Sequence, residues 1–234
     1  MLCSPKELGL YDWAGGLIAF ADDLSLGTPL VGAWPAETVL ELELTPNRAD
    51  AFSVLGVARD LAAKLDRPLR HPAADETLGD ETGDDGLSVE VADLDGCPQL
   101  VLQRIDGVAV GPSPAWLQRR LAALGLRPRT NVVDVTNYVT YELGQPSHAY
   151  DLRVLEDGRL QVRPARAGEE VELLDGETYR LETADQVIAT PTPDGGSKAV
   201  GLAGVMGGLH DSVRSDTTSV ALEVAHFDPV RVRK

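Results

Sequence analysis

The sequence predicts an α+β fold whose larger part is a β-rich, largely antiparallel sheet or sandwich with a few helices. Short apolar runs typical of strands outnumber the helical segments, and the two kinds do not alternate as they would in a doubly wound fold. Asp175-Gly176 adds a tight-turn signal of the kind that joins antiparallel strands. The expected strands cover residues 87–91, 99–110, 160–164, 171–174, 186–189, 199–205 and 218–224.

The pattern before the β-rich part predicts a small helical or mixed module. Leucine and glutamate alternate over residues 40–44, which indicates a half-buried strand. Apolar residues then recur every three or four positions over residues 52–65, which predicts a helix with one buried face. We therefore expect this module to cover residues 37–72.

Two further helices are expected within the β-rich part. Ser113 and Pro114 suit the N-cap and the first helical position, and Gly125 suits the C-terminal end. The next helix is expected over residues 138–143. The buried stripe of the first of these helices would consist of Leu117, Leu121 and Leu124.

An acidic segment separates the small module from the β-rich part. Residues 73–86 hold six acidic side chains and no basic one. Such a segment cannot bury enough apolar surface to offset the entropy that it loses on ordering. We therefore expect a solvated linker over residues 73–86 and a β-rich domain over residues 87–230.

The composition excludes several classes of function. The formal net charge of −16 is opposite in sign to that of a protein that grips long nucleic acid by itself. No apolar run approaches the roughly 18–20 residues of a membrane span, and no secretory signal opens the chain, so we expect a cytoplasmic protein. Cys3 and Cys97 stand alone and the histidines have no metal-ligand spacing, so neither a disulfide nor a metal site is expected.

Polar residues stand in unusual surroundings in three segments, which cover residues 134–151, 203–208 and 221–227. The residues alone leave each segment open. Asp134 and Asn137 suit the cap of a helix, and His148 suits an ordinary hydrogen-bonded histidine as well as a functional one. The glycines of the second segment suit a turn, without the lysine of a phosphate-binding loop. Glu223 stands in an apolar strand, where pattern alone predicts an exposed side chain.

The same segments resemble, in order, the β chain of bacterial phenylalanyl-tRNA synthetases. Residues 1–9 are similar to the tail of that family's inserted oligonucleotide-binding domain. The resemblance implies an internal piece of the β chain, with this tail and a connector over residues 1–36 and the start of the next module over residues 231–234. The matching stretches are LTPNR at 44–48, GVAR at 56–59, DVTNY at 134–138, ELGQPSHAYD at 142–151, AGVMGG at 203–208 and LEVAHF at 222–227.

The family's β-rich domain is an editing domain that hydrolyses tyrosine mistakenly attached to tRNA(Phe). Carried over by position, the resemblance implies that Glu223 recognises the phenol of tyrosine, against the pattern-based prediction that this side chain is exposed. Further pocket positions of the family lie beyond the last residue of this chain. The implied catalytic residues are His148, Thr136 and Asn137, and the implied substrate-binding residues are Glu223, Ala203, Gly204, Met206 and Gly207.

The chain departs from the family at two positions in the third matching region. The family usually has phenylalanine where Tyr150 stands and methionine where Ser147 stands. Neither change removes a group with an implied role, so the resemblance still implies editing. Such a site is needed because a pocket shaped for phenylalanine rejects tyrosine only about a hundredfold.

The resemblance also implies the partners. They are the 3′ end of tRNA(Phe), the tyrosine or phenylalanine moiety on it, and the α chain of an α2β2 synthetase. The complete enzyme would use ATP and Mg²⁺ outside this chain, and the editing site would need no cofactor. Two alternatives stay open: a non-catalytic structural or subunit-interface domain, and a module that binds an amino acid without hydrolysing an ester.

Overall fold

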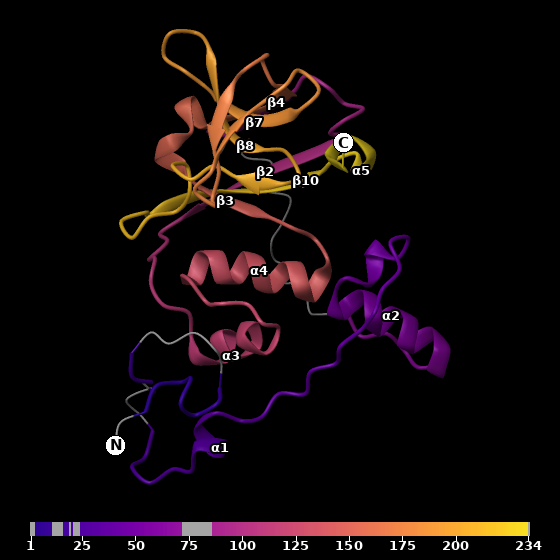
Figure 1. The fold of residues 1–234 in the computed structure, drawn as a ribbon, viewed down its shortest axis with the longest axis vertical. Coiled ribbons are helices and arrows are strands. Elements are labelled where there is room, and N and C mark those ends of the chain that lie inside the picture. The colour runs from indigo at the N-terminus through magenta and orange to yellow at the C-terminus, as the bar shows by residue number, and fades with distance from the viewer. Residues whose placement is uncertain (1–2, 11–15, 19, 21–23, 72–85, 234) are drawn as a thin grey trace. The chain divides into compact units, whose positions relative to one another are not determined.

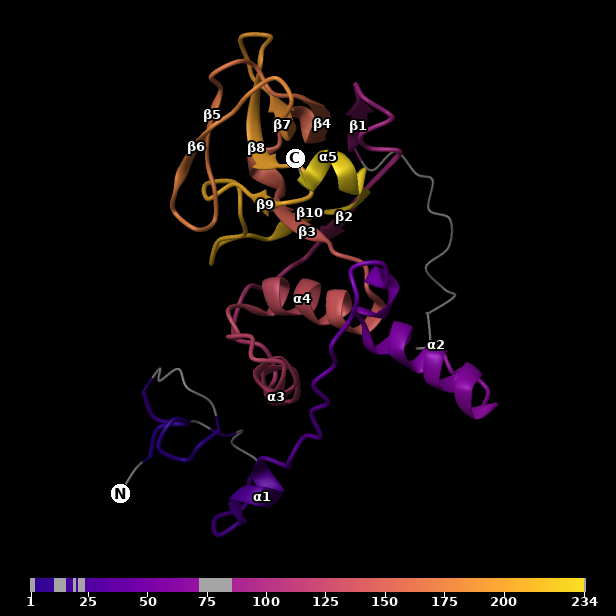
Figure 2. The same cartoon turned by 45° about the vertical axis from the view of Figure 1, so that its right-hand side comes forward.

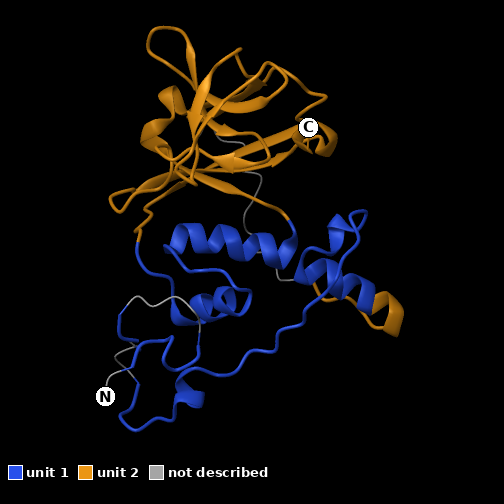
Figure 3. Ribbon diagram, viewed as in Figure 1, with its two compact units in different colours: residues 1–61, 111–144 blue, residues 62–110, 145–234 orange. Residues whose placement is uncertain are grey.

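The computed structural model describes residues 3–10, 16–18, 20, 24–71 and 86–233 (Figure 1). The chain divides into two compact units, which are described separately (Figure 3). Unit 1 lies within residues 1–61 and 111–144, and unit 2 lies within residues 62–110 and 145–234. Unit 1 is mainly helical, and the strands of unit 2 pair mainly antiparallel, so the predicted α+β class is confirmed.

Unit 2 contains two main sheets and a separate hairpin. In the first sheet, β1 pairs parallel with β4 and the other pairs are antiparallel; its order is β1 (Ser88–Val91), β4 (Arg159–Pro164), β7 (Gln186–Pro191), β8 (Ser197–Leu202) and β9 (Met206–Gly207). The second sheet is antiparallel, in the order β2 (Gln99–Asp106), β10 (Ser219–His226) and β3 (His148–Asp151). The hairpin, which can be followed in Figure 2, consists of β5 (Glu170–Glu172) and β6 (Thr178–Arg180).

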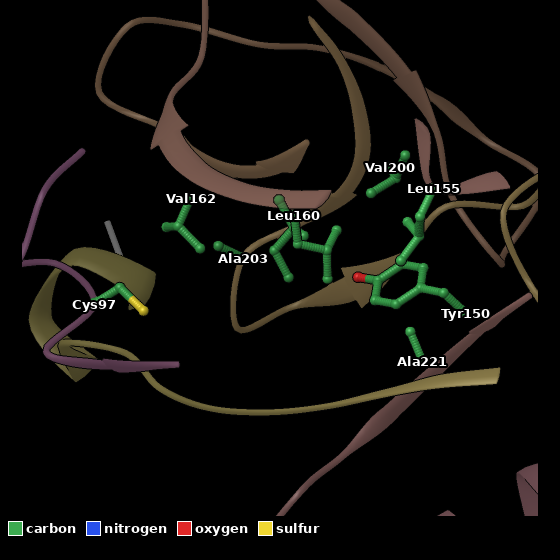
Figure 4. Close-up of a cluster of buried hydrophobic side chains, with 9 residues drawn as sticks. Cys97, Tyr150, Leu155, Leu160, Val162, Val200, Ala203 and Ala221 are labelled. Carbon is green, nitrogen blue, oxygen red and sulfur yellow. The ribbon is translucent and has the colours of Figure 1, made fainter. Parts of the chain in front are cut away.

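One cluster of buried side chains joins the two main sheets. Leu160 of β4 and Val200 of β8 come from the first sheet, while Tyr150 of β3 and Ala221 of β10 come from the second. Each of these side chains is at most 1% exposed. Figure 4 shows the ring of Tyr150 among the residues of this cluster, with its hydroxyl directed toward the middle. The two sheets therefore form a sandwich, and apolar burial on their facing sides holds them together.

Unit 1 is built around α3 (Ala115–Ala123) and α4 (Asn131–Leu143). Leu117 and Leu121 of α3 are buried, as predicted, whereas Leu124 is 44% exposed because it lies past the last helical residue. Trp116 and Tyr138 add an edge-to-face contact between the two helices, with 5.5 Å between ring centroids. The other helical elements among the described residues are α1 (Leu30–Ala33), η1 (Ala49–Ala51), α2 (Val54–Leu65), η2 (Leu152–Val154), η3 (Glu156–Gly158) and α5 (Pro229–Arg233).

The predicted N-terminal ends of α3 and α4 are wrong in detail. Pro114 takes the N-cap position of α3, and the Ser113 hydroxyl donates to Oδ2 of Asp134 at 2.5 Å instead of capping the helix. Helix α4 begins at Asn131 rather than at residue 138, so Asp134 lies inside it. There the buried carboxylate also accepts the backbone N–H of Arg129 at 2.8 Å. Asp134 therefore ties the connection between the helices to α4.

The predicted strand over residues 40–44 is wrong. Leu40 and Leu42 are 69% and 51% exposed, and no strand among the described residues pairs with this segment. A strand needs a hydrogen-bonded neighbour and a covered face, and alternation alone provides neither. The seven strands predicted for the β-rich part each overlap a strand of the structure, whereas β3, β6 and β9 were not predicted.

Residues 73–85 of the predicted acidic linker lie outside the described residues. The predicted domain boundaries at residues 36, 72, 86 and 230 stay predictions. Among the residues that are described, no helix is both long enough and apolar enough to cross a membrane.

Candidate functional site

The candidate site lies on the inner face of the second sheet. Strands β3 and β10 pair so that His148 stands opposite Glu223, and Tyr150 stands opposite Ala221. Side chains two residues apart on a strand point to the same face, so these four share one face of the sheet. Because Tyr150 and Ala221 belong to the buried cluster, that face is the one turned toward the first sheet.

Glu223 is a buried carboxyl group in the central strand of its sheet. The residue is 5% exposed, so the prediction of an exposed side chain, drawn from pattern alone, is wrong. The hydroxyl of Tyr150 donates to its Oε2 at 3.1 Å, and among the described residues no group donates to Oε1. Burial raises the pKa of Glu223 to about 7, while the bond from Tyr150 acts in the opposite direction. Near neutral pH the carboxyl group is therefore close to its titration midpoint.

His148 presents a neutral imidazole beside this carboxyl group. Its ring meets the ring of Tyr150 edge to face, with 4.5 Å between centroids. Its Nε2 atom is buried and has no hydrogen-bond partner in the part of the chain that the structure describes. Burial lowers the pKa of His148 to about 4, and nearby Asp211 partly opposes that shift. A neutral imidazole nitrogen of this kind can accept or donate one hydrogen bond, according to its tautomer.

Strand β9 and the turn that joins it to β8 contribute four of the predicted site residues, and Gly207 of β9 lies against His148. A Cβ atom at Gly207 would lie 2.5 Å from Cε1 and 2.7 Å from Nε2 of His148, so only glycine lets the imidazole lie where it does. Ala203 is 3% exposed and belongs to the same cluster as Tyr150. Its backbone N–H donates to the carbonyl of Gln186 at 2.9 Å, so this amide is not available to a substrate.

Two other predicted site residues, Gly204 in this turn and Met206 in β9, face different surroundings. Gly204 has a φ of +71°, which favours glycine, and a Cβ there would meet Val232 at 2.9 Å and Phe227 at 3.2 Å. The side chain of Met206 packs against a second buried cluster, which includes Val171 of β5. The structure thus groups Glu223, His148, Ala203 and Gly207, with Gly204 on the turn before β9 and Met206 in β9.

Thr136 and Asn137 lie on α4 in unit 1 and are therefore described apart from the site in unit 2. The Thr136 hydroxyl donates to the carbonyl of Val133 at 2.8 Å, a common use of threonine within a helix. Asn137, like Asp134, lies inside the helix rather than at its cap. Their catalytic roles stay predictions.

Sequence reasoning missed the part that Tyr150 plays. The tyrosine was noted as a departure from the family pattern, but nothing in the sequence paired it with a carboxyl group 73 residues away. The only available signal was chemical, since a buried tyrosine hydroxyl usually finds a hydrogen-bond partner. Asp211, which is 6% exposed and accepts a bond from Lys198 at 2.9 Å, was also missed.

A pocket of about 590 Å³ lies in unit 1, and none of the predicted site residues line it. Its wall is mainly apolar and includes Leu30, Val31, Trp34 and Val39. In the described part of the chain, no group of three or more histidine, cysteine, aspartate or glutamate residues is placed to hold a metal ion.

Comparisons with known proteins place this chain in a family. Residues 96–234 match the family model of the B3/4 domain. The whole chain is 44% identical over 235 residues to the phenylalanine–tRNA ligase beta subunit of Thermotoga maritima and 43% identical over 235 residues to that of Geobacter sulfurreducens. It spans 29% of the length of each of these relatives.

A solved structure is more distantly similar. It is a crystal structure of an N-terminal fragment of the phenylalanyl-tRNA synthetase beta subunit from Pyrococcus horikoshii, with a TM-score of 0.44 and 14% identity over 79% of this chain and 54% of that one. The sequence comparisons confirm the predicted resemblance to the beta subunits of this synthetase. The match over residues 96–234 covers more than half of the chain, which therefore belongs to the B3/4 domain family.

Proposed function

We propose that this chain carries the editing site of a phenylalanyl-tRNA synthetase β subunit and that it hydrolyses tyrosine mistakenly attached to tRNA(Phe). The observation that carries the proposal is the state of Glu223. Its buried carboxyl group accepts a phenol hydroxyl, that of Tyr150, on Oε2, while Oε1 accepts no bond from the described residues. A group in this state is suited to receive a second phenol, that of a tyrosyl substrate.

Selection of tyrosine over phenylalanine follows from the desolvation of Glu223. A phenol that donates to a buried carboxylate forms a charge-assisted hydrogen bond, which is stronger than a neutral one. A phenylalanyl group would displace water from Oε1 without replacing its hydrogen bond, and an unsatisfied buried charged group costs upward of about 1–3 kcal/mol. The site that attaches phenylalanine rejects the tyrosine hydroxyl only weakly. The editing site would instead select for that hydroxyl, so tyrosyl esters would be hydrolysed in preference to phenylalanyl esters.

Hydrolysis itself needs little more than positioning. Water would attack the carbonyl carbon of the ester, and the bond to the ribose oxygen of tRNA would break. The tyrosine carboxyl group keeps the water oxygen, and the ribose oxygen takes up a proton to leave a free hydroxyl. His148 stands opposite Glu223, and its neutral Nε2 has no partner among the described residues, so it is suited to orient the attacking water or the ester. The ester is an activated substrate, so correct placement supplies most of the rate. Thr136 and Asn137, which the resemblance implies as catalytic residues, stay part of the proposal.

The partners follow from the same proposal. The relatives are beta subunits, and this chain spans 29% of their length. The α subunit of the complete α2β2 enzyme would hold ATP and Mg²⁺ and attach phenylalanine. Docking of tRNA(Phe) would depend on surfaces outside this chain, because its net charge is −16.

The test is deacylation of Tyr-tRNA(Phe), both by the chain and by an assembled synthetase that contains it. Glu223→Gln keeps the size of the side chain and removes its charge, and is expected to lower the hydrolysis rate at least tenfold. Glu172→Gln is the matched control, because Glu172 lies in the β5–β6 hairpin and bonds to His210. Hydrolysis by Glu223→Gln at the rate of the unsubstituted protein would contradict the proposal. Binding of tyrosine without any hydrolysis would favour an amino-acid-binding module.

A further inference from the structure

We propose that Tyr150 is a positioning residue for Glu223: its hydroxyl holds the carboxylate by Oε2 and leaves Oε1 to accept the phenol of the tyrosyl group. The inference rests on the proposed function and adds a residue that supports its specificity by holding the carboxylate in its ionised form. It gives Tyr150 a role in substrate selection without direct contact with the reacting ester.

The hydroxyl of Tyr150 is a fixed donor. Tyr150 is 1% exposed, and its ring packs in the cluster that joins the two sheets (Figure 4). On the strand side it meets the ring of His148 edge to face. The ring cannot turn away without opening a cavity in the core, which would cost several kcal/mol. The bond to Oε2 of Glu223, at 3.1 Å, is therefore held by packing.

Among the described residues, the groups that face Glu223 do not include a cation that could hold its charge. His148 stands opposite on β3 and is neutral near pH 7, because burial lowers its pKa. Leu102 stands opposite on β2. Cys97, before β2, is buried and feels the charge of Glu223, which helps to raise the pKa of its thiol. Of these groups, the Tyr150 hydroxyl is the one that favours the ionised carboxylate.

Asp211 completes the electrostatic surroundings. Its charge opposes the burial that lowers the pKa of His148, and it adds to the rise in the pKa of Tyr150. Burial and Glu223 raise the pKa of Tyr150 further, so its hydroxyl keeps its proton and stays a donor. The amine of Lys198 pairs with Asp211 at 2.9 Å, so this positive charge is held by a carboxylate other than Glu223.

The two carboxyl oxygens of Glu223 have different roles: Oε2 accepts the bond from Tyr150, and Oε1 is left for the substrate. The bond from Tyr150 to Oε2 is present whichever amino acid occupies the site, so it does not distinguish tyrosine from phenylalanine. It does stabilise the ionised form, whose unpaired oxygen penalises phenylalanine most strongly. The choice is then made at Oε1 alone, where tyrosine supplies a donor and phenylalanine supplies none.

The test removes only the hydroxyl, by Tyr150→Phe, and follows the titration of Glu223 by NMR in the full chain with ¹³C-labelled glutamate carboxyls. Glu223→Gln identifies the resonance, because that signal disappears. The titration midpoint is expected to rise by about one pH unit or more, as a hydrogen bond to a charged group implies. Tyr179→Phe is the control, because its hydroxyl donates to the exposed Asp175 at 2.7 Å and should leave the Glu223 midpoint unchanged.

A second measurement links the shift to specificity. The rates of deacylation of Tyr-tRNA(Phe) and Phe-tRNA(Phe) are compared across pH, and their ratio measures the preference for tyrosine. The midpoint pH at which this ratio rises is expected to be higher in Tyr150→Phe, by the same amount as the Glu223 titration midpoint. An unchanged Glu223 midpoint would overturn the inference. So would faster hydrolysis of Tyr-tRNA(Phe) by Tyr150→Phe at every pH, because Tyr150 would then compete with the substrate.

The two proposals fail separately. If the unsubstituted protein does not hydrolyse Tyr-tRNA(Phe), the proposed function fails, and the NMR titration still decides whether Tyr150 holds the carboxylate. If hydrolysis is present and the midpoint does not move, only the role of Tyr150 fails.

Discussion

The imidazole of His148 lies against the backbone of Gly207, so close that a Cβ atom at residue 207 would fall within 2.7 Å of both Cε1 and Nε2. The contact joins β3 of the second sheet to β9 of the first. It fixes a ring whose Nε2 is buried and has no partner among the described residues. The glycine is therefore a condition for the position of the histidine.

Gly207→Ala is expected to displace the imidazole and to lower hydrolysis of Tyr-tRNA(Phe) at least tenfold. The added methyl group overpacks a closed site, so the free energy of unfolding should fall by about 1–3 kcal/mol. A deacylation assay measures the hydrolysis rate, and urea denaturation measures the free energy of unfolding. Gly111→Ala is the control, since a Cβ there meets nothing within 4 Å. A normal deacylation rate in Gly207→Ala would show that the position of His148 does not matter.

Glu223→Gln is expected to stabilise the protein at alkaline pH while it removes selectivity. The pKa of Glu223 is raised from 4.5 to about 7, so the folded state binds the proton more tightly than the unfolded state. The resulting stability is fully present below pH 4.5 and is lost as pH rises through 7. The loss amounts to about 3 kcal/mol by pH 8, and glutamine avoids it because it carries no charge. Urea denaturation at pH 5 and pH 8 checks this, and an equal pH dependence in both proteins would contradict it.

His148→Gln is expected to change the pH dependence in the opposite direction. Burial lowers the pKa of His148 from 6.5 to about 4, so the unfolded state binds the proton more tightly. The histidine therefore lowers stability as pH falls from 6.5 toward 4. Unfolding measured at pH 7 and pH 5 should show a smaller acid loss in His148→Gln than in the unsubstituted protein. A larger loss would mean that the imidazole is protonated in the folded state.

Sequence patterns correctly predicted the strands whose alternate side chains are buried against the core. Residues 160–164 fall in β4, where Leu160 and Val162 are fully buried, as alternation requires. The same rule failed at residues 40–44, because alternation describes a side-chain pattern and says nothing of a partner strand. The limit is physical, since strand pairing is a tertiary property.

The burial of Glu223 shows a second limit. Its strand, β10, is central in its sheet, and the neighbouring Val220 and Ala221 are both buried although they point to opposite faces. When both faces are covered, alternation cannot separate an inward residue from an outward one. The resemblance to a family implied a role for Glu223 in the pocket, which the pattern could not predict. The bond from Tyr150 was beyond both, because it depends on the register of β3 against β10.

Asp151 is expected to stabilise unit 2 far more than an exposed aspartate that shares its partner. It is 2% exposed, accepts the hydroxyl of Thr217 at 2.6 Å and pairs with Arg153 at 2.6 Å. These bonds lower its pKa to about 2, so its contribution is present above pH 3.8 and is lost as pH falls through 2. Asp151→Asn should lower the free energy of unfolding at pH 7 by about 2–4 kcal/mol.

Asp216→Asn is the matched control for Asp151→Asn, because Asp216 pairs with the same Arg153 at 2.9 Å but its side chain is 68% exposed. An exposed ion pair contributes less than about 1 kcal/mol, since water and salt screen the charges. Urea denaturation of both variants at pH 7 separates burial from charge pairing. If the two substitutions destabilise the protein equally, the ion pair with Arg153 accounts for the effect. If Asp151→Asn alone is costly, the burial of Asp151 accounts for it, together with the bond from Thr217, which anchors the end of β3 beside Tyr150.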